Sequence, residues 1–405
     1  MIAAHTPISR SFHSAARLAL LASFALLTAI ASAQTFTSLV SFDYTNGAYP
    51  FYGSLTPDSN GNLYGTTFLG GNTALGTVFE VSAAGELTTL YNFCSQNDCA
   101  DGFTPYGGLV LGADGNLYGT TASGGTNFDG TVFQLTPAGV LTTIYNFCSQ
   151  TNCADGGTPQ TGLTVSKNGT LYGTTSFGGA NSVGTIFSVT PTGTFTVLHS
   201  FCSEANCADG DLVYSALLAA SNGTLYGTTN LGGTNNWGTV FSITPVGKFT
   251  TLHTFAYTDG AGPIGGLVQA TNGNLYGTTE AGGKTDSGTV FQLAKGNKFT
   301  TIYNFCAKTY CADGAAPFGT LLAAQGNLFG TAAAGGSNGW GSVFEITPAG
   351  VLTTLHSFSE TDGAEPFAGL TLGANGDLYG TTYNGGDLSC TTPPLGCGTV
   401  FSIAK

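Results

Sequence analysis

The ten cysteines are the residues whose spacing most clearly indicates chemistry. They form local pairs: Cys94/Cys99, Cys148/Cys153, Cys202/Cys207, Cys306/Cys311 and Cys390/Cys397. An even number of cysteines in local pairs is typical of disulfides in an exported chain. A zinc site needs about four ligands at one point, whereas these pairs belong to separate parts of the sequence and have no histidine beside them. We therefore expect five disulfides and no bound metal.

An Asp-Gly pair recurs just after the cysteine pairs. Its aspartates are Asp101, Asp155, Asp209, Asp259, Asp313 and Asp362, with Asn46 in the first copy. A ring of these carboxylates could bind calcium. The alternative is that each aspartate caps its own turn with its side chain. We favour the second interpretation, because no D-x-D-x-D-G ligand run is present, and we expect no cofactor.

No residue pattern indicates catalysis. His199, His253 and His356 each replace the tyrosine of a recurring LYNF segment, and a position shared with tyrosine is expected to be structural. The sequence contains no Gly-x-Ser-x-Gly elbow, no HExxH, no Ser-His-Asp spacing and no phosphate loop. Paired carboxylates remain a possible source of hydrolase chemistry, but nothing selects a pair.

The most variable part of the repeat is the segment after a recurring Gly-Gly, which is the place to look for binding. Phe128, Trp237 and Trp340 lie in it, with Asn235, Asn236 and Asn338 beside the tryptophans. Aromatic rings with amide neighbours suit the apolar faces of sugars, although these rings could instead pack against neighbouring loops. We predict that Trp237→Ala and Trp340→Ala each weaken polysaccharide binding by about 2 kcal/mol and leave the fold intact.

These residues are positioned by seven near-copies of one repeat. The heptapeptide GNLYGTT recurs, with small changes, from Gly61, Gly115, Gly169, Gly223, Gly273, Gly326 and Gly376. The second copy shows four short segments rich in β-branched and aromatic residues, at 108–111, 116–121, 130–135 and 141–147, each closed by turn residues. Four antiparallel strands in a period of this length predict one propeller blade.

The glycine inside each YGT segment, such as Gly119, stands in a strand interior, where it signals a close approach. We expect it to admit a large aromatic side chain from the neighbouring blade.

The chain begins on a fourth strand, Thr35 to Phe42, and ends on a third strand, so its first strand should complete the last blade and close the ring. An open solenoid has no reason for this offset. The prediction is an all-β, seven-bladed propeller over residues 34–405, its ring closed by the N-terminal strand. The expected blades are 47–93, 102–147, 156–201, 210–255, 260–305, 314–358, and 363–405 with 34–42.

The pattern GNLYGTTxxGGxxxxGTVFxxTPxG resembles the Gloeo/Verruco (GloVer) tandem repeat family of secreted bacterial proteins, over essentially the whole chain after residue 33. A weaker likeness joins its GNLYG strands to the GNIYV strands of NHL-type propellers. The resemblance implies an extracellular location and no established activity. Members of the family carry C-terminal surface anchors, and no such anchor is visible here. No catalytic residue is carried over.

Residues 1–33 have the pattern of a secretory signal. Arg10 and Arg17 precede the apolar run Leu18 to Ile30, and Ala31-Ser32-Ala33 is a typical cleavage site; an uncleaved membrane anchor is the alternative. Cleavage would leave 7 Lys+Arg against 22 Asp+Glu, a formal charge of −15. With no basic patch evident in the sequence, such a chain should not bind nucleic acid or anionic membranes.

We therefore expect a monomeric extracellular or periplasmic protein with no membrane span after cleavage. Its predicted role is that of a non-enzymatic binding or scaffold module, whose loop face contacts a glycan or a protein. The alternative is an extracellular hydrolase or lyase with a metal-assisted site in the central tunnel.

Overall fold

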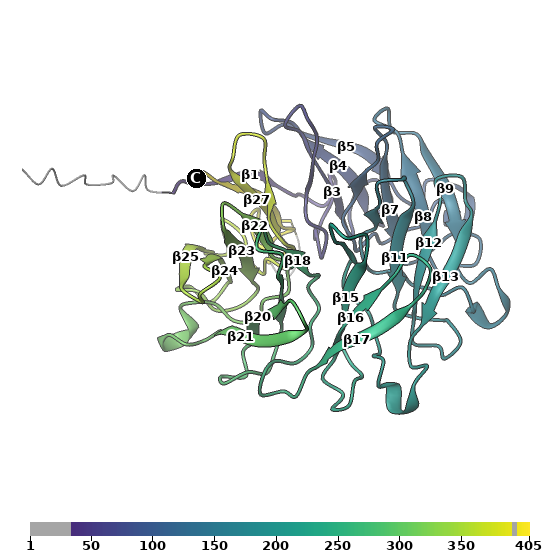
Figure 1. Ribbon diagram of the computed structural model, residues 1–405. Coiled ribbons are helices and arrows are strands. Elements are labelled where there is room, and N and C mark those ends of the chain that lie inside the picture. Colours follow the sequence, from purple (N-terminus) through teal and green to yellow (C-terminus); the bar gives the residue numbers. More distant parts are fainter. Residues whose placement is uncertain (1–33, 391–394) are drawn as a thin grey trace, which may run out of the picture. The chain divides into compact units, whose positions relative to one another are not determined.

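The structure is a computed structural model that describes residues 34–390 and 395–405 (Figure 1). The predicted signal lies outside these residues. The described chain forms seven four-stranded antiparallel sheets, so the prediction of a seven-bladed β-propeller is confirmed. No helix in this part of the chain is long and apolar enough to cross a membrane.

We number the blades 1 to 7; in blades 1 to 6 the four strands follow chain order, and in blade 7 the fourth strand is β1. Blade 1 is β2 (Thr56–Pro57), β3 (Leu63–Thr67), β4 (Thr77–Val81) and β5 (Leu87–Asn92); blade 2 is β6 (Val110–Leu111), β7 (Leu117–Thr121), β8 (Thr131–Leu135) and β9 (Leu141–Asn146); blade 3 is β10 (Thr164–Val165), β11 (Leu171–Thr175), β12 (Thr185–Val189) and β13 (Phe195–Ser200); blade 4 is β14 (Leu218–Ala219), β15 (Leu225–Thr229), β16 (Thr239–Ile243) and β17 (Phe249–Thr254).

The remaining blades have the same order. Blade 5 is β18 (Val268–Gln269), β19 (Leu275–Thr279), β20 (Thr289–Ala294) and β21 (Lys298–Asn304); blade 6 is β22 (Leu322–Ala324), β23 (Asn327–Ala332), β24 (Ser342–Ile346) and β25 (Leu352–Ser357); blade 7 is β26 (Thr371–Leu372), β27 (Leu378–Thr382), β28 (Thr399–Ile403) and β1 (Phe36–Ser41); short 3-10 turns η1 to η4 occupy Asn97–Cys99, Thr151–Cys153, Ala205–Cys207 and Thr309–Cys311.

Seven apolar clusters fill the seven interfaces between neighbouring blades. One of them joins Phe147 and Val132 of blade 2 to Phe187, Leu171 and Val189 of blade 3. Every other pair of neighbouring blades shares a cluster built in the same way. Because each blade buries its two faces against two different neighbours, the apolar contacts run around a closed ring.

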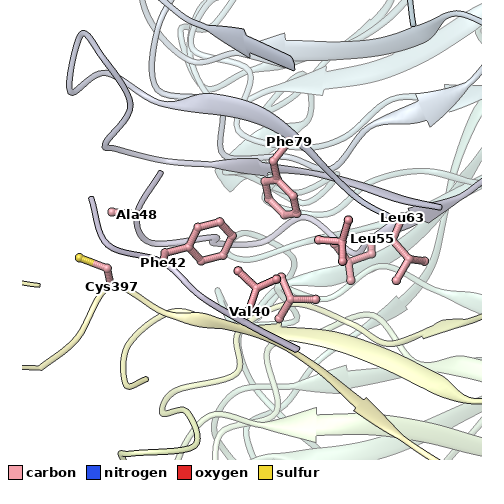
Figure 2. Packing of buried hydrophobic residues seen from close by; sticks show 9 residues of the cluster. Val40, Phe42, Ala48, Leu55, Leu63, Phe79 and Cys397 are labelled. Carbon is pink, nitrogen blue, oxygen red and sulfur yellow. The ribbon is translucent and has the colours of Figure 1, made fainter. Parts of the chain in front are cut away.

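The seventh interface depends on the first strand of the chain. β1 pairs with β28, with Phe36 opposite Ile403 and Ser41 opposite Thr399. Val40 and Phe42 then pack into blade 1, where the rings of Phe42 and Phe79 lie 5.2 Å apart (Figure 2). The N-terminal strand therefore supplies both the hydrogen-bonded edge of blade 7 and part of its contact with blade 1.

The glycine inside the YGT segment admits an aromatic ring from its own blade. Gly119 of β7 lies opposite Phe133 of β8, and a Cβ atom at Gly119 would lie 2.6 Å from the Phe133 ring and 2.9 Å from Leu109. The expectation that this aromatic comes from the neighbouring blade is wrong. Within one blade the phenylalanine of the third strand lies across the bare glycine of the second.

Candidate functional site

The loops of the protein gather on two opposite faces. Loops from the second to the third strand share one face with the connections from one blade to the next, and bridges such as Phe103 with Ser123 join the two kinds of loop. We call this face the loop face. The shorter turns, from first to second and from third to fourth strand, form the opposite turn face.

The predicted disulfides are confirmed. The five bonds join Cys94–Cys99, Cys148–Cys153, Cys202–Cys207, Cys306–Cys311 and Cys390–Cys397, and no cysteine is left free. The first four each enclose a 3-10 turn in a connection between blades, on the loop face. These four disulfides hold four of the seven connections between blades.

The recurring aspartates stabilise the same connections through hydrogen bonds to their buried carboxylates. Asp155 is fully buried, and its carboxylate accepts hydrogen bonds from Tyr145 Oη (2.8 Å), Ser149 N (2.9 Å), Ser149 Oγ (2.8 Å) and Gln150 N (3.1 Å). These donors hold the pKa of Asp155 below its ordinary value, although burial acts in the opposite direction. The arrangement matches the turn-capping interpretation, since three of the four donors belong to the loop of Asp155 and the fourth, Tyr145, to the strand that leads into it.

The histidines take the place of that tyrosine. His199 Nε2 lies 3.0 Å from Asp209 Oδ2, and His253 and His356 pair with Asp259 and Asp362 in the same way. A phenylalanine from the next blade stacks on each imidazole; the His199 and Phe249 ring centroids are 4.0 Å apart. Each histidine thus makes the carboxylate contact that tyrosine makes in other blades and packs on the next blade.

This packing predicts a pH dependence of stability. Burial lowers the pKa of His199 and of His356 below 6.5 and outweighs their paired aspartates. Since the fold favours neutral imidazoles, their contribution is complete above pH 6.5 and is lost as pH falls through the lowered values. We expect the melting temperature to fall between pH 7.5 and pH 5, and His199→Tyr with His356→Tyr to remove that fall.

Tyrosine occupies the equivalent position in blades 1, 2 and 5, so the double variant should fold. Thermal denaturation monitored by circular dichroism across this pH range measures the effect. The same acid dependence in the variant would contradict the assignment to these two imidazoles.

The described residues contain one group of three metal-type ligands, Asp129 with Cys148 and Cys153. Both cysteines are in a disulfide, so neither can supply the thiolate that a metal would bind.

The axis of the propeller contains a small cavity of about 40 Å³. It is lined by the segments that precede the first strands, among them Tyr52, Thr161, Tyr214, Phe318 and Phe367. This volume has room for roughly two or three water molecules and not for a sugar ring. No carboxylate or imidazole lines it, so its described side chains offer no ligand set for a metal.

A cluster of aromatic side chains lies at the end of this cavity on the loop face. Its origin is local: a recurring proline, as in Pro366–Phe367, packs on the glycine that opens the third strand of the preceding blade. Pro366 Cδ would lie 2.6 Å from a Cβ at Gly341, which has φ +99°. The next residue then lies close to the axis, where small residues such as Gly369 and Thr320 let neighbouring blades meet.

We name this cluster the axial mouth. It comprises Phe51, Tyr52, Phe68, Tyr106, Phe318, Phe367 and Tyr383. The Phe51 ring centroid is 4.9 Å from Tyr383, 5.2 Å from Phe367 and 5.5 Å from Tyr106. All seven rings are half-buried, and none belongs to the clusters between blades. The mouth rings pack on one another across blades but lie outside the seven buried clusters.

Blades 4 and 5 give the mouth a polar side. Burial, and then the carboxylate of Glu280, raises the pKa of Tyr52 to about 12. Burial also raises the pKa of Glu280, which is hydrogen-bonded by Asn230, and that of Asp211 near Tyr214. One oxygen of Asp211 is buried with no hydrogen-bond partner in the described chain. The mouth thus combines apolar ring faces with hydroxyl, amide and carboxyl groups.

The sequence-predicted binding residues lie farther out on the same face and do not form one cluster. The exposed fraction of Phe128 is 61% and that of Trp237 is 40%, whereas Trp340 is half-buried against the core of blades 6 and 7. Trp237 packs on Tyr257, with centroids 4.6 Å apart, and no described ring contact joins Trp237 to Trp340.

The three predicted asparagines are used by the loops themselves. Asn235 and Asn338 donate to the main-chain oxygens of Phe255 and Phe358, and Asn236 accepts from Gly232 N.

Sequence reasoning missed the axial mouth, although a signal was present. The residue after the recurring proline, or after Val213 in blade 4, is Phe51, Tyr106, Gln160, Tyr214, Ile264, Phe318 or Phe367. This position is aromatic in five of the seven blades and precedes the strand nearest the axis. Because the sequence analysis took the most variable segment of the repeat as the binding region, it favoured the outer loops.

Fold and site together define a closed seven-bladed β-propeller of repeat origin, with a disulfide-braced loop face. The pattern of the Gloeobacter/Verrucomicrobia repeat matches residues 26–217 and 203–401, and the chain belongs to this family. No curated protein sequence matches it.

Several solved structures have a similar fold. One is a putative 6-phosphogluconolactonase from Bacteroides uniformis (15% identity, 81% of this chain and 87% of that one, TM-score 0.49). Another is a putative gluconolactonase (12% identity, 92% of each chain, TM-score 0.43). A third is a PQQ-bound aldose sugar dehydrogenase from Streptomyces coelicolor (16% identity, 92% and 98%, TM-score 0.42). At this level of similarity we carry over no activity.

Proposed function

We propose that the protein is a secreted, non-enzymatic carbohydrate-binding propeller that holds a glycan over the axial mouth. The observation that carries this proposal is the cluster of seven half-buried rings that lies outside every core between blades. Half-exposed aromatic faces stabilise the apolar faces of sugar rings, and neighbouring polar groups fix their orientation. Tyr214, Asn230 and Glu280 provide those groups.

The surroundings of the mouth support a rigid binding site. Disulfides and buried aspartates hold the connections that contain Tyr106 and Phe318 of the mouth, so little ordering of these two segments is needed when a ligand binds. The disulfides also favour an extracellular or periplasmic location.

Trp237 extends the same surface outward. Its main-chain oxygen accepts from Gly262 N at 3.1 Å, and Gly262 lies against Glu280 and Asn230 of the mouth. We propose that Trp237, with Tyr257 beside it, contacts a second part of an extended glycan.

The alternative, a metal-assisted hydrolase or lyase in the tunnel, has less support. Protein sites for calcium or zinc usually include carboxylate or imidazole ligands, and the residues that line the axial cavity include neither. The binding hypothesis has a continuous surface of side chains in its favour.

Binding to a panel of immobilised polysaccharides tests the proposal. We expect Phe51→Ala with Phe367→Ala to weaken retention by at least about tenfold, since one aromatic contact in a binding centre is worth on the order of 2 kcal/mol. Trp237→Ala should weaken the binding of long glycans more than the binding of short ones.

Tyr310→Ala is the matched control, because Tyr310 is exposed on the same face and no described ring contact joins it to the mouth. Unchanged binding in the mouth variant, with an unchanged melting temperature, would refute the site. Turnover of any bound glycan by the wild-type protein would refute the non-enzymatic role.

A further inference from the structure

The turn face has a sector that differs in charge from the rest of the molecule. The turns of blades 3 to 5 on this face contain Lys167, Lys248, Lys295 and Lys298, all exposed, and no carboxylate. The strands and turns of the other four blades bring Asp58, Glu80, Glu86, Asp114, Glu345 and Asp377 toward this face, with Lys405 as their one lysine. Four of the seven lysines in the described part of the chain thus lie in one sector.

These four lysines have no partner of opposite charge. Within residues 34–390 and 395–405, every ion pair is a histidine–aspartate pair on the loop face. The lysines belong to three neighbouring blades: Lys167 follows β10, Lys248 follows β16, and Lys295 and Lys298 flank the single turn from β20 to β21. Their charge is therefore available to a ligand.

Two neighbouring hollows lie in this sector. A cavity of about 520 Å³ lies between blades 3 and 4 and is lined by Lys167, Asn168, Tyr172 and Pro245. A cavity of about 410 Å³ lies between blades 4 and 5 and is lined by Tyr226, Gln269, Asn297 and Lys295. Ser221 lines both, so the two form one groove across the turn of blade 4, with a lysine lining each part.

The groove also contains two tyrosine hydroxyl groups whose counterparts in most other blades are hydrogen-bonded within the blade. In blades 1, 2, 5 and 7 the tyrosine of the second strand is hydrogen-bonded to an aspartate or asparagine of the adjacent turn, as Tyr118 is to Asp114 at 2.7 Å. Tyr172 and Tyr226, the two that line the groove, have no such bond; Asn168 and Asn222 bond within their own turns instead.

We propose that this groove binds a polyuronate, a polysaccharide that bears carboxylates on its sugar rings. A lysine in each hollow suits carboxylates that are spaced along a chain, and the Tyr, Asn and Ser side chains between them suit sugar hydroxyls. A nucleic acid fits less well, because its dense phosphate charge would meet only four lysines on a protein of strongly negative net charge.

The groove is on the opposite face from the axial mouth, so this inference does not depend on the function proposed above. Titration of polygalacturonate oligomers into the full chain, followed by calorimetry, tests it. We expect saturable binding that weakens as salt is added and no binding of the fully methyl-esterified oligomer.

Lys167→Gln with Lys295→Gln should weaken the binding by on the order of tenfold or more, because each variant residue loses a charge-assisted hydrogen bond. The matched control is Lys284→Gln with Lys308→Gln, the same change in net charge on the loop face. Unchanged melting temperatures would establish that both variants are folded.

Three results would overturn the proposal: no binding of polygalacturonate by the wild-type protein, an equal loss in both pairs of variants, or equal affinity for the methyl-esterified oligomer. Tighter binding of a short DNA duplex, or a salt-dependent dimer of the protein alone, would assign the sector to a different partner and would also overturn it. The Phe51→Ala, Phe367→Ala variant should bind polygalacturonate like the wild type.

Discussion

Removal of residues 34–43 should prevent the protein from folding to a stable propeller. These residues contain β1, whose loss leaves β28 as an unpaired edge and removes Val40 and Phe42 from the interface with blade 1 (Figure 2). Truncating one buried phenylalanine to alanine costs about 3–5 kcal/mol, and domains are stable by about 5–15 kcal/mol. Losing two buried side chains and a strand should exhaust that margin. Expression followed by size-exclusion chromatography and circular dichroism measures the result.

A circular permutant keeps the residues of β1 but places them after β28 in the chain. It therefore tests whether the truncated protein fails because the ring is not closed. In blade 6, five residues separate the paired Ile346 and Leu352. Joining Lys405 to Gln34 through one added glycine places five residues between Ile403 and Phe36, which are paired in the same way. The permutant, begun at Tyr44 and ended at Asp43, should therefore fold with seven complete blades. A truncated protein that melts like the full chain would contradict the closure role of β1.

The ring itself could be predicted because its evidence is local and repeated. Turn residues such as Pro137 and Gly139 mark the end of the third strand in four of the seven copies. The starting strand Thr35 to Phe42 has no partner except in the last blade. Likewise, the disulfides follow from pairs that are close in sequence. These features need no knowledge of side-chain packing.

Side-chain placement across blades could not be predicted in the same way. The partner of Gly119 was assigned to the wrong blade because sequence periodicity gives the strand order but not the direction in which Phe133 lies. The axial mouth and the sector of four lysines on the turn face were not predicted, for a related reason. Phe51 and Phe367 are at opposite ends of the sequence, and only a closed ring brings them within 5.2 Å.

The buried aspartates carry the second large effect on stability. Asp155→Ala leaves Ser149 N and Gln150 N without their acceptor and removes one of the two partners of Tyr145 Oη, around a carboxylate that is fully buried. An unsatisfied buried polar group costs about 1–3 kcal/mol, so the free energy of unfolding should fall by roughly 3–5 kcal/mol. The pKa of Asp155 is lowered in the fold, so its contribution is present above pH 3.8 and is lost as pH falls through the lowered value.

Asp362→Ala is the matched control, because the same position of the repeat is about a quarter exposed there. The Asp362 side chain is 27% exposed, its connection has no disulfide, and it accepts from Ser359 N and pairs with His356. Water can replace Asp362 as an acceptor, so its loss should cost about 1 kcal/mol. Urea denaturation at pH 7 gives both free energies of unfolding. Equal losses of unfolding free energy in the two variants would contradict the role assigned to burial of the carboxylate. The expected difference means that the buried aspartates of the disulfide loops stabilise the loop face, on which the axial mouth lies.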